Sequence, residues 1–273
     1  MFTRFNITSL EKENLLPYKT LRRVDEHIKN GIFVAEGKKL VERLLESNIK
    51  IISLLLTEEW FSQFEAQIKK RVENIDVFVA PKIILNQIVG FKLHQGIMGV
   101  GEAPQNIILH DFVKLTKRTL FAVIDGIMNS ENVGVIVRNC AAFNVDALIV
   151  GETSSDPFLR RAVRNSMGTI FKIPIIYSTK LADDILFLKN EFGFNIFAAH
   201  TSIKSKSIYE INFCKNSCIV FGNEEDGPRK EILNICDCFE IPMKAGIDSL
   251  NVANASAVVL YEVDRQRLVS NFK

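Results

Sequence analysis

Three short stretches of the chain combine polar side chains with glycines in a way that ordinary turns do not require. They are DGIMNSENVGVIVRN at 125–139, FGNEEDGPRKEIL at 221–233 and IPMKAGIDSLNVANASA at 241–257. Glycine lets a ligand approach the backbone closely, and convergent polar groups fix a ligand's orientation. Each stretch alone is a weak signal, so its meaning depends on whether the fold brings the three together.

The first stretch offers Asn132, Gly134 and Arg138 as candidates. Asn132 is a candidate helix cap, and Gly134 permits close backbone approach. Arg138 follows several apolar residues, and an arginine in such surroundings needs a partner or a ligand. The alternative is a surface arginine whose apolar stem lies along the protein while its charge stays in water.

The other two stretches are only partly explained by helix starts. Pro228 is well placed at the first position of a helix, and Ser249 is a plausible helix cap. Those roles leave the polar and small residues directly at the strand end and the start of the last helix without a structural reason. The unexplained residues are Gly222, Asn223, Glu224 and Asn251.

The second part of the chain alternates apolar strand patterns with helical patterns, which predicts a parallel sheet covered on both faces. The predicted strands are 119–125, 146–152, 172–177, 195–200, 217–223 and 239–244. The predicted helices are 134–143, 158–167, 181–192, 228–235 and 252–268. Ligands bind beyond the carboxyl ends of such strands, which singles out the loops after Asp125, Gly222 and Lys244. The three stretches are therefore expected at one edge of one sheet.

The first part of the chain also mixes strands and helices, which predicts a small α/β unit. Its predicted strands include 51–56, and its helices include 38–47 and 58–72. The pattern breaks at GEAPQN, residues 101–106. We therefore predict two domains, residues 1–104 and 105–273.

Composition narrows the class of protein. The chain has 273 residues, of which 47% are hydrophobic and 24% charged, with a net charge of +2. This composition is typical of a globular protein, and the charge permits a nucleic-acid partner. The Leu-Arg-Arg stretch at 21–23 is interpreted as a solvated face. Apolar runs are too short to span a bilayer and the start does not resemble a signal peptide, so we predict a cytoplasmic protein without a membrane partner.

Two further classes are disfavoured. No G-x-G-x-x-G follows the first strand of the second part, which argues against an NAD enzyme and a Rossmann-type methyltransferase. The five cysteines match no common zinc spacing, so no metal site is predicted. Cys140 and Cys218 are expected to be buried as small apolar residues.

The motifs resemble those of a known family. NVGVIVRN, GNEEDGP and IPMKAGIDSLNVANA are similar, in order and spacing, to the three motifs of the SpoU/TrmH-type RNA ribose 2′-O-methyltransferases. DPFLRRAVRNSMGTIFKIPI resembles that family's middle segment, and VAEGKKLVERLL and HQGIMGV resemble its amino-terminal substrate-binding domain. The resemblance implies a SPOUT-class α/β fold: a knotted parallel-sheet methyltransferase domain preceded by a small α/β RNA-binding domain similar to RNA-binding ribosomal proteins.

The resemblance also implies a cofactor and roles for residues. S-adenosylmethionine would be held by Gly222, Asn223, Ile241, Met243 and Leu250. The catalytic set would be Arg138, Asn132, Glu224, Ser249 and Asn251, with Arg138 assigned to activation of the hydroxyl. Because a guanidinium keeps its proton, we interpret Arg138 as an anchor for phosphate and ribose and leave the proton acceptor open. The family usually has Asp-Pro where this chain has Asn129-Ser130.

Partners follow from the same resemblance. The family is dimeric through the carboxyl-terminal domain, so a homodimer is expected, with the helix from Val252 as a candidate contact. Ribosomal RNA is favoured as the substrate. The alternatives are a tRNA ribose methyltransferase, an enzyme that methylates a base nitrogen, and a non-catalytic RNA-binding or ribosome assembly protein.

Overall fold

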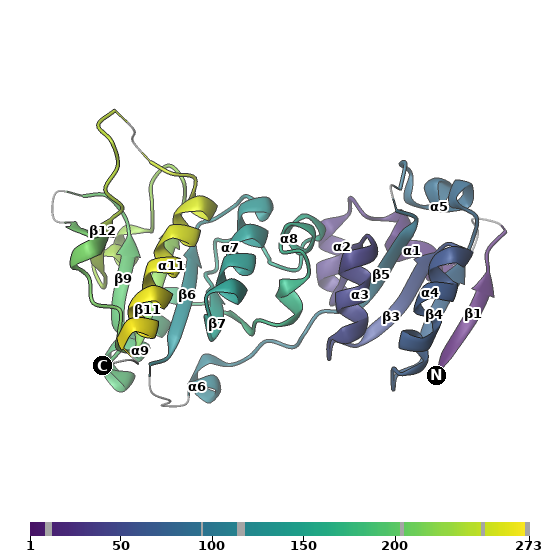
Figure 1. Ribbon diagram of the computed structural model, residues 1–273, viewed down its shortest axis with the longest axis horizontal. Coiled ribbons are helices and arrows are strands. Elements are labelled where there is room, and N and C mark those ends of the chain that lie inside the picture. The colour runs from purple at the N-terminus through teal and green to yellow at the C-terminus, as the bar shows by residue number, and fades with distance from the viewer. Residues whose placement is uncertain (9–12, 94, 114–117, 203–204, 247–248, 271–273) are drawn as a thin grey trace. The chain divides into compact units, whose positions relative to one another are not determined.

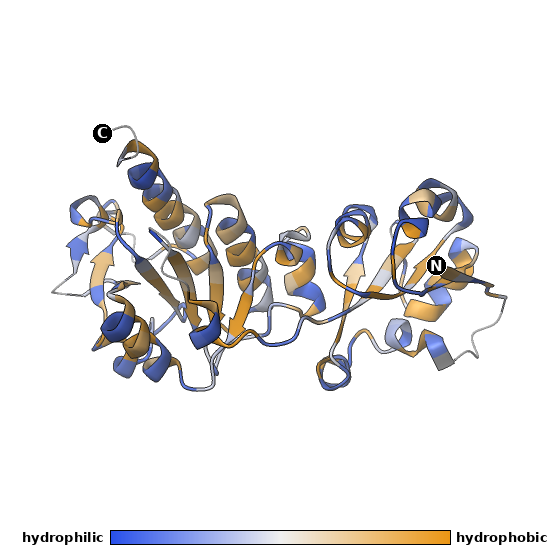
Figure 2. Ribbon diagram, turned by 90° about the horizontal axis from the view of Figure 1, so that it is seen from below, coloured by the Kyte–Doolittle hydropathy of each residue, from blue (hydrophilic) through white to orange (hydrophobic). Residues whose placement is uncertain are grey.

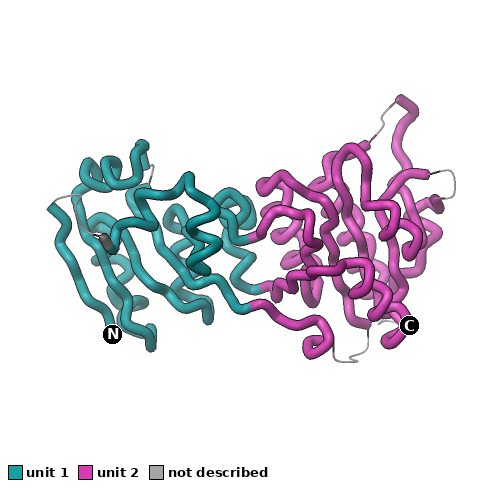
Figure 3. The backbone as a smooth tube through the Cα atoms, turned by 180° about the vertical axis from the view of Figure 1, so that it is seen from behind, with its two compact units in different colours: residues 1–105, 158–172 teal, residues 106–157, 173–273 magenta. Residues whose placement is uncertain are grey.

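The computed structural model describes residues 1–8, 13–93, 95–113, 118–202, 205–246 and 249–270. The chain forms two compact units (Figure 3). Unit 1 comprises Met1–Gln105 and Phe158–Lys172, and unit 2 comprises Asn106–Pro157 and Ile173–Lys273. The segment 158–172 therefore folds with the amino-terminal part of the chain, although it lies between two strands of unit 2 in sequence.

Unit 1 is built on a mixed sheet in the order β1-β4-β3-β5-β2 (Figure 1). The strands are β1 Phe2–Asn6, β2 Ile32–Glu36, β3 Ile51–Leu56, β4 Ile75–Val79 and β5 Ile97–Glu102. β5 is antiparallel to both neighbours, whereas β4 is parallel to β1 and β3. The helices are α1 Leu16–Lys19, α2 Val24–Lys29, α3 Lys38–Glu46, α4 Glu58–Lys69, α5 Lys82–Val89 and α8 Arg160–Asn165. The 3-10 turns are Glu13–Leu15 and Thr169–Phe171.

Aromatic packing joins the segment 158–172 to unit 1. The ring centroid of Phe33 on β2 lies 5.2 Å from that of Phe158 and 5.5 Å from that of Phe171. Phe33 is only 1% exposed and lies across Gly101, where a Cβ atom would come 2.5 Å from the ring. Burial of these rings is favourable and explains why α8 belongs to this unit.

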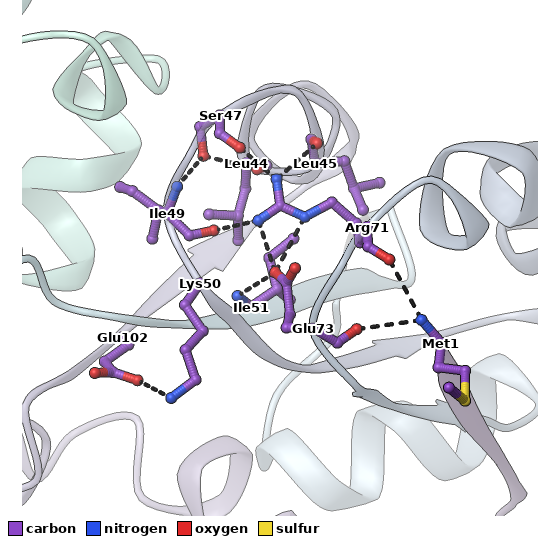
Figure 4. A network of polar contacts seen from close by, with 10 residues as sticks. All are labelled: Met1, Leu44, Leu45, Ser47, Ile49, Lys50, Ile51, Arg71, Glu73 and Glu102. Carbon is purple, nitrogen blue, oxygen red and sulfur yellow. Dashed lines mark hydrogen bonds and ion pairs between the residues drawn. The ribbon is translucent and has the colours of Figure 1, made fainter.

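Arg71 closes the turn between α3 and β3 (Figure 4). Its guanidinium donates to the carbonyl oxygens of Leu45, Ser47 and Ile49 and to the carboxylate of Glu73. Burial alone raises the pKa of Glu73, but hydrogen bonds from Arg71 and from the Ile51 N–H outweigh it and hold that pKa below its ordinary value. Arg71 thereby satisfies the Leu45 carbonyl in the last turn of α3, which no helical N–H can reach, and two carbonyls of the turn that follows.

Unit 2 contains a seven-stranded sheet in the order β10-β12-β9-β11-β6-β7-β8, with every pair parallel. The strands are β6 Leu120–Asp125, β7 Ala147–Val150, β8 Ile175–Tyr177, β9 Asn195–Ala199, β10 Lys206–Ser207, β11 Ser217–Gly222 and β12 Asp237–Glu240. The helices are α6 Leu109–Phe112, α7 Ser130–Ala142, α9 Leu181–Phe192, α10 Lys230–Leu233 and α11 Val252–Ser270, with a 3-10 turn at Ile208–Glu210. β6 and β11 are buried throughout. In Figure 2 most strands are orange, that is apolar, whereas the helices mix orange and blue. The predicted parallel sheet is confirmed.

Several boundaries differ from those predicted. The helix predicted from residue 134 begins at Ser130, because the Asn129 side chain accepts a hydrogen bond from the Glu131 N–H at 2.9 Å and caps it there. The strand predicted at 239–244 lies at Asp237–Glu240. Cys140 and Cys218 are fully buried, as predicted. Within the described part of the chain, no helix is both long and apolar enough to cross a membrane.

Candidate active site

A cavity of about 320 Å³ lies at the carboxyl ends of β9, β11 and β12. Its size falls in the range of small-ligand pockets. Seven of the ten residues predicted for the site line it, while Asn132, Arg138 and Asn251 do not. The seven are Gly222, Asn223, Glu224, Ile241, Met243, Ser249 and Leu250.

Gly222 and Asn223 shape the turn that follows β11. Asn223 and Gly227 exchange two backbone hydrogen bonds, of 3.2 and 3.0 Å. A Cβ atom on Gly222 would lie 2.0 Å from the nitrogen of Pro228, so only glycine fits there. The Asn223 side chain accepts from the Glu225 N–H at 2.9 Å and donates to the Gly126 carbonyl at 3.0 Å. These two residues therefore hold the wall of the cavity in place, and the Asn223 carboxamide is occupied by the protein itself.

Asn132, Glu224 and Asn251 form a chain of hydrogen bonds beside the cavity. The Asn132 amide donates to the Glu224 carboxylate, and the Asn251 amide donates to the Asn132 oxygen at 3.2 Å. Because Glu224 lines the cavity, these hydrogen bonds connect the start of α7 and the start of α11 to the cavity wall. The three predicted residues come from three separate motifs, and the structure brings them together.

The caps of α7 and α11 differ from those predicted, and the differences free side chains for the site. Asn129 caps α7, so Asn132 is available to bond Glu224. Asn251 caps α11 by accepting from the Ala253 N–H at 2.9 Å, whereas Ser249 was predicted to do so. Asn251 directly precedes the helix, so its short side chain reaches an unpaired N–H of the first turn. Ser249 precedes the helix by two further residues and lines the cavity.

Arg138 lies outside this arrangement. It is exposed on α7, and its guanidinium makes no hydrogen bond or ion pair with any residue that the structure describes. Arg138 lies six positions after Asn132, which turns it roughly 120° around the helix at 3.6 residues per turn. The neighbouring Asn139 faces α11, donating to the Ala253 carbonyl at 2.9 Å and to the Ser256 hydroxyl at 2.8 Å.

The prediction missed His200, Thr201 and Glu240, which also line the cavity. His200 directly follows β9, and Glu240 ends β12. The rule that ligands lie beyond the carboxyl ends of parallel strands would have indicated both positions. His200 also packs against the turn after β11, since a Cβ on Gly227 would lie 2.4 Å from its Nδ1 atom.

An ion pair with a buried carboxylate supports the turn that follows β11. Asp125, only 1% exposed, ends β6 and accepts from the Arg229 backbone N–H and Nε, both at 2.8 Å. Arg229 also donates to Glu152 at 2.9 Å. That hydrogen bond raises the pKa of Arg229, while burial opposes the shift. Asp125 thus ties the loop after β6 to the start of α10, and it performs a structural role that its strand-end position did not reveal.

The cavity wall combines apolar side chains with exposed polar groups. Phe221, Ile241, Leu250 and Val252 supply apolar surface, and Leu250 is 38% exposed. Glu224 and Ser249 supply polar atoms at the same cavity. Such a lining suits a ligand with an aromatic or aliphatic body and a few groups that form hydrogen bonds.

Comparison with known proteins identifies both parts of the chain. Residues 119–261 match the SpoU rRNA Methylase family, and residues 34–107 match the RNA 2′-O ribose methyltransferase substrate binding family. A protein of Mycobacterium tuberculosis named as an uncharacterized tRNA/rRNA methyltransferase is 31% identical over 89% of this chain and 84% of its own. A 23S rRNA (guanosine-2′-O-)-methyltransferase of Neisseria meningitidis is 33% identical over 74% of this chain and 81% of its own.

A solved structure agrees with the fold. The AdoMet-bound rRNA methyltransferase of Sinorhizobium meliloti matches with a TM-score of 0.83 and 25% identity, covering 96% of this chain and 98% of that one. The sequence match spans the three motifs that form the cavity and its neighbouring hydrogen-bonded chain. The chain belongs to the SpoU rRNA methylase family.

Proposed function

We propose that this protein transfers a methyl group from S-adenosylmethionine to a ribose 2′-hydroxyl of structured RNA, with ribosomal RNA as the favoured substrate. The observation that carries the proposal is the joining of three family motifs by the Asn132–Glu224–Asn251 hydrogen bonds beside a ligand-sized cavity. The ribosomal substrate is supported by relatives whose names specify 23S rRNA.

The cavity suits S-adenosylmethionine in size and lining. When bound, the cofactor supplies an electrophilic methyl group, so the protein needs to orient the acceptor and assist loss of its proton. We propose that Ile241, Met243 and Leu250 contact the cofactor through apolar surface. Gly222 and Asn223 would act indirectly, because they fix the turn whose backbone borders the same cavity.

The hydrogen-bonded chain orients polar groups toward the acceptor. Asn251 donates to Asn132 and accepts from Ala253, so its amide has one defined orientation. Asn132 in turn donates to one carboxylate oxygen of Glu224. We propose that Glu224 accepts a hydrogen bond from the ribose hydroxyl, and that Ser249 contributes a second polar contact at the cavity wall.

Arg138 is proposed as an anchor for RNA. It is exposed, and no described residue neutralises its charge. A guanidinium matches the geometry of a phosphate and keeps its charge at neutral pH. We expect Arg138→Ala to reduce both RNA affinity and methylation, and retained methylation with unchanged affinity would contradict the role.

Two domains with separate roles complete the proposal. Residues 1–104 would bind the RNA substrate and residues 105–273 would carry the methyltransferase site, in line with the two family matches. The segment 158–172 modifies this division, because it belongs to the second part in sequence and packs with unit 1.

A homodimer through α11 is part of the proposal. One face of this helix is buried against α7 and β11. Another carries the exposed apolar residues Val258, Tyr261, Leu268 and Val269. A surface helix needs only one apolar face for its own fold, so the second favours a contact with another chain. A second copy is the occupant we propose, because the SpoU family is expected to dimerise through this domain.

We further propose that unit 2 is knotted. β12 lies at one side of β9, yet α11, which follows it in sequence, packs against α7 and β11. The chain after Glu240 therefore returns past the turn that follows β11, and both border the same cavity. Pulling the chain from its ends with optical tweezers tests this, because a knot leaves the extended chain shorter than its 273 residues allow.

We place the enzyme in the cytoplasm, where its RNA substrate would be found. All five cysteines are free thiols, as is usual in a reducing compartment.

The decisive experiment maps 2′-O-methyl sites in total RNA from cells with and without the gene. We expect one or more sites in 23S rRNA to disappear, and purified protein with S-adenosylmethionine to restore them. Glu224→Gln and Asn251→Ala are expected to bind RNA and to lose most of the methylation. A lost site in tRNA alone would replace the substrate, and a product methylated on a base nitrogen would replace the reaction.

A further inference from the structure

Unit 1 contains a second cavity, of about 560 Å³, with a strongly basic lining. Five basic residues and one acidic residue line it, so the formal charge is five minus one, or +4. The charged residues are Lys19, Arg22, Arg23, Glu36, Arg160 and Arg164. Three of the cations come from the end of α1 and the turn before α2, and two come from α8, all within unit 1. The Leu-Arg-Arg stretch, interpreted from sequence as a solvated face, thus borders a cavity.

Internal contacts hold part of this charge in place. Arg160 forms an ion pair with Glu36 at 2.9 Å, and their side chains are 28% and 13% exposed. The guanidinium carbon of Arg160 also lies 5.5 Å from the ring centroid of Phe91. These contacts restrict Arg160 and fix α8 against the cavity, which prepares the site for a ligand.

Two other cations are left without a counterion. Arg22 and Arg164 are exposed, and neither guanidinium makes a hydrogen bond or ion pair with any residue that the structure describes. Arg23 is paired with Glu26 at 3.0 Å but remains 67% exposed. Like charges gathered at one cavity repel each other, so an arrangement of this kind is expected to favour an anion.

We propose that this cavity binds consecutive phosphates of the RNA backbone, with Arg22 and Arg164 making the contacts. The proposal rests on the proposed function, since it assigns a binding site to the same RNA. Each phosphodiester of RNA carries one negative charge. Several consecutive nucleotides can therefore balance the +4 charge of the cavity lining, whereas a single free phosphate cannot. Arginine also offers a planar fork that bonds two phosphate oxygens at once. Part of the substrate-binding surface would then be supplied by α8, a helix encoded within the methylase stretch of the sequence.

The test measures RNA affinity of the full-length protein over a range of salt concentrations. The double variant Arg22→Ala/Arg164→Ala should bind a 23S rRNA fragment about tenfold more weakly, and the slope of log K against log salt should fall by about two, roughly one per lost contact. The matched control is Arg161→Ala, which removes an exposed arginine from α8 that does not line the cavity. It should change neither quantity.

Further measurements separate the possible outcomes. The melting temperature and S-adenosylmethionine affinity of the double variant should equal those of the wild type, and Arg22→Lys/Arg164→Lys should keep the salt slope. If the double variant binds RNA with unchanged affinity and slope, the proposal is overturned. It is also overturned if inorganic phosphate raises the melting temperature of the wild type alone while RNA affinity is equal in both proteins. If the double variant loses RNA affinity but the wild type methylates no RNA, the result supports this binding site and contradicts the proposed function.

Discussion

Gly222 shows how a missing side chain can determine the shape of a site. A Cβ atom there would overlap Pro228 at 2.0 Å, so we expect Gly222→Ala to displace the turn 223–227. The cost should be about 2–3 kcal/mol, as for other overpacked positions, together with weaker S-adenosylmethionine binding by calorimetry. Gly193→Ala is the control, because its φ of +63° is strained for alanine but its Cβ meets open space. Equal destabilisation in the two variants would refute the steric argument.

The pair Asp125–Arg229 is a second prediction at this scale. Asp125 is buried, so Asp125→Ala leaves the Arg229 guanidinium without its principal buried partner and should destabilise the protein by about 2–4 kcal/mol. Arg229→Met in the same background removes the guanidinium that has lost its buried partner and should recover part of that loss. Urea denaturation of the two single variants and the double variant measures the coupling, which should be about 1–3 kcal/mol. Strictly additive effects would mean that the pair is not coupled.

At the scale of elements, Arg71 should stabilise the end of α3. Arg71→Met removes the donors to three carbonyl oxygens and to Glu73, and we expect a loss of about 2–3 kcal/mol in urea denaturation. Lys70→Met, at an exposed neighbouring position, should stay within about 0.5 kcal/mol of the wild type. If both substitutions have an equal effect, the Arg71 hydrogen bonds do not stabilise the end of α3.

The contact between Arg71 and Glu73 also predicts that the stability of the protein depends on pH. The folded-state pKa of Glu73 lies below its ordinary value, so its contribution is present above that ordinary value and is lost as the pH falls through the folded pKa. The stability of the wild type should therefore fall more steeply on acidification than that of Arg71→Met. The measurement is the free energy of unfolding as a function of pH, obtained by urea denaturation. Parallel profiles for the two proteins would show that Arg71 does not lower the pKa of Glu73.

The elements themselves were largely predictable from sequence. The predicted helix at 181–192 and strand at 51–56 match α9 and β3, because long periodic or buried apolar patterns have few alternative placements. Helix starts were less predictable, since Asn129 and Asn132 are equally good caps by residue type and only the fold selects between them. The rule that ligands bind beyond the carboxyl ends of parallel strands predicted that the three motif loops lie at one edge of the sheet. It did not reveal the bond between Asn132 and Asn251, which joins side chains 119 positions apart.

At the scale of the whole molecule, no single division of the sequence separates the two units, because unit 1 consists of two segments. Phe33 is buried by Phe158 and Phe171, which follow the first 157 residues in sequence. A fragment of residues 1–105 should therefore expose Phe33, melt at a lower temperature than unit 1 does in the full chain, and bind a hydrophobic dye. Phe158→Ala in the full-length protein should destabilise unit 1 by about 3 kcal/mol. A fragment as stable as the intact unit would show that the segment 158–172 contributes little.

The apolar outer face of α11 leads to a prediction about assembly. Val258 and Tyr261 are 43% and 58% exposed, and the Phe143 ring lies 6.1 Å from the Tyr261 ring in an edge-on arrangement. A charge introduced here would be solvated in a monomer and desolvated in a dimer, so Val258→Asp should shift the protein to a monomer without lowering its melting temperature as a monomer. Light scattering measures the mass, and Leu186→Asp, at an exposed apolar position on α9, is the control. If the wild type is already a monomer at micromolar concentration, the dimer proposal fails. If Val258→Asp is a monomer that still methylates RNA at the wild-type rate, the dimer exists but each chain carries a complete site.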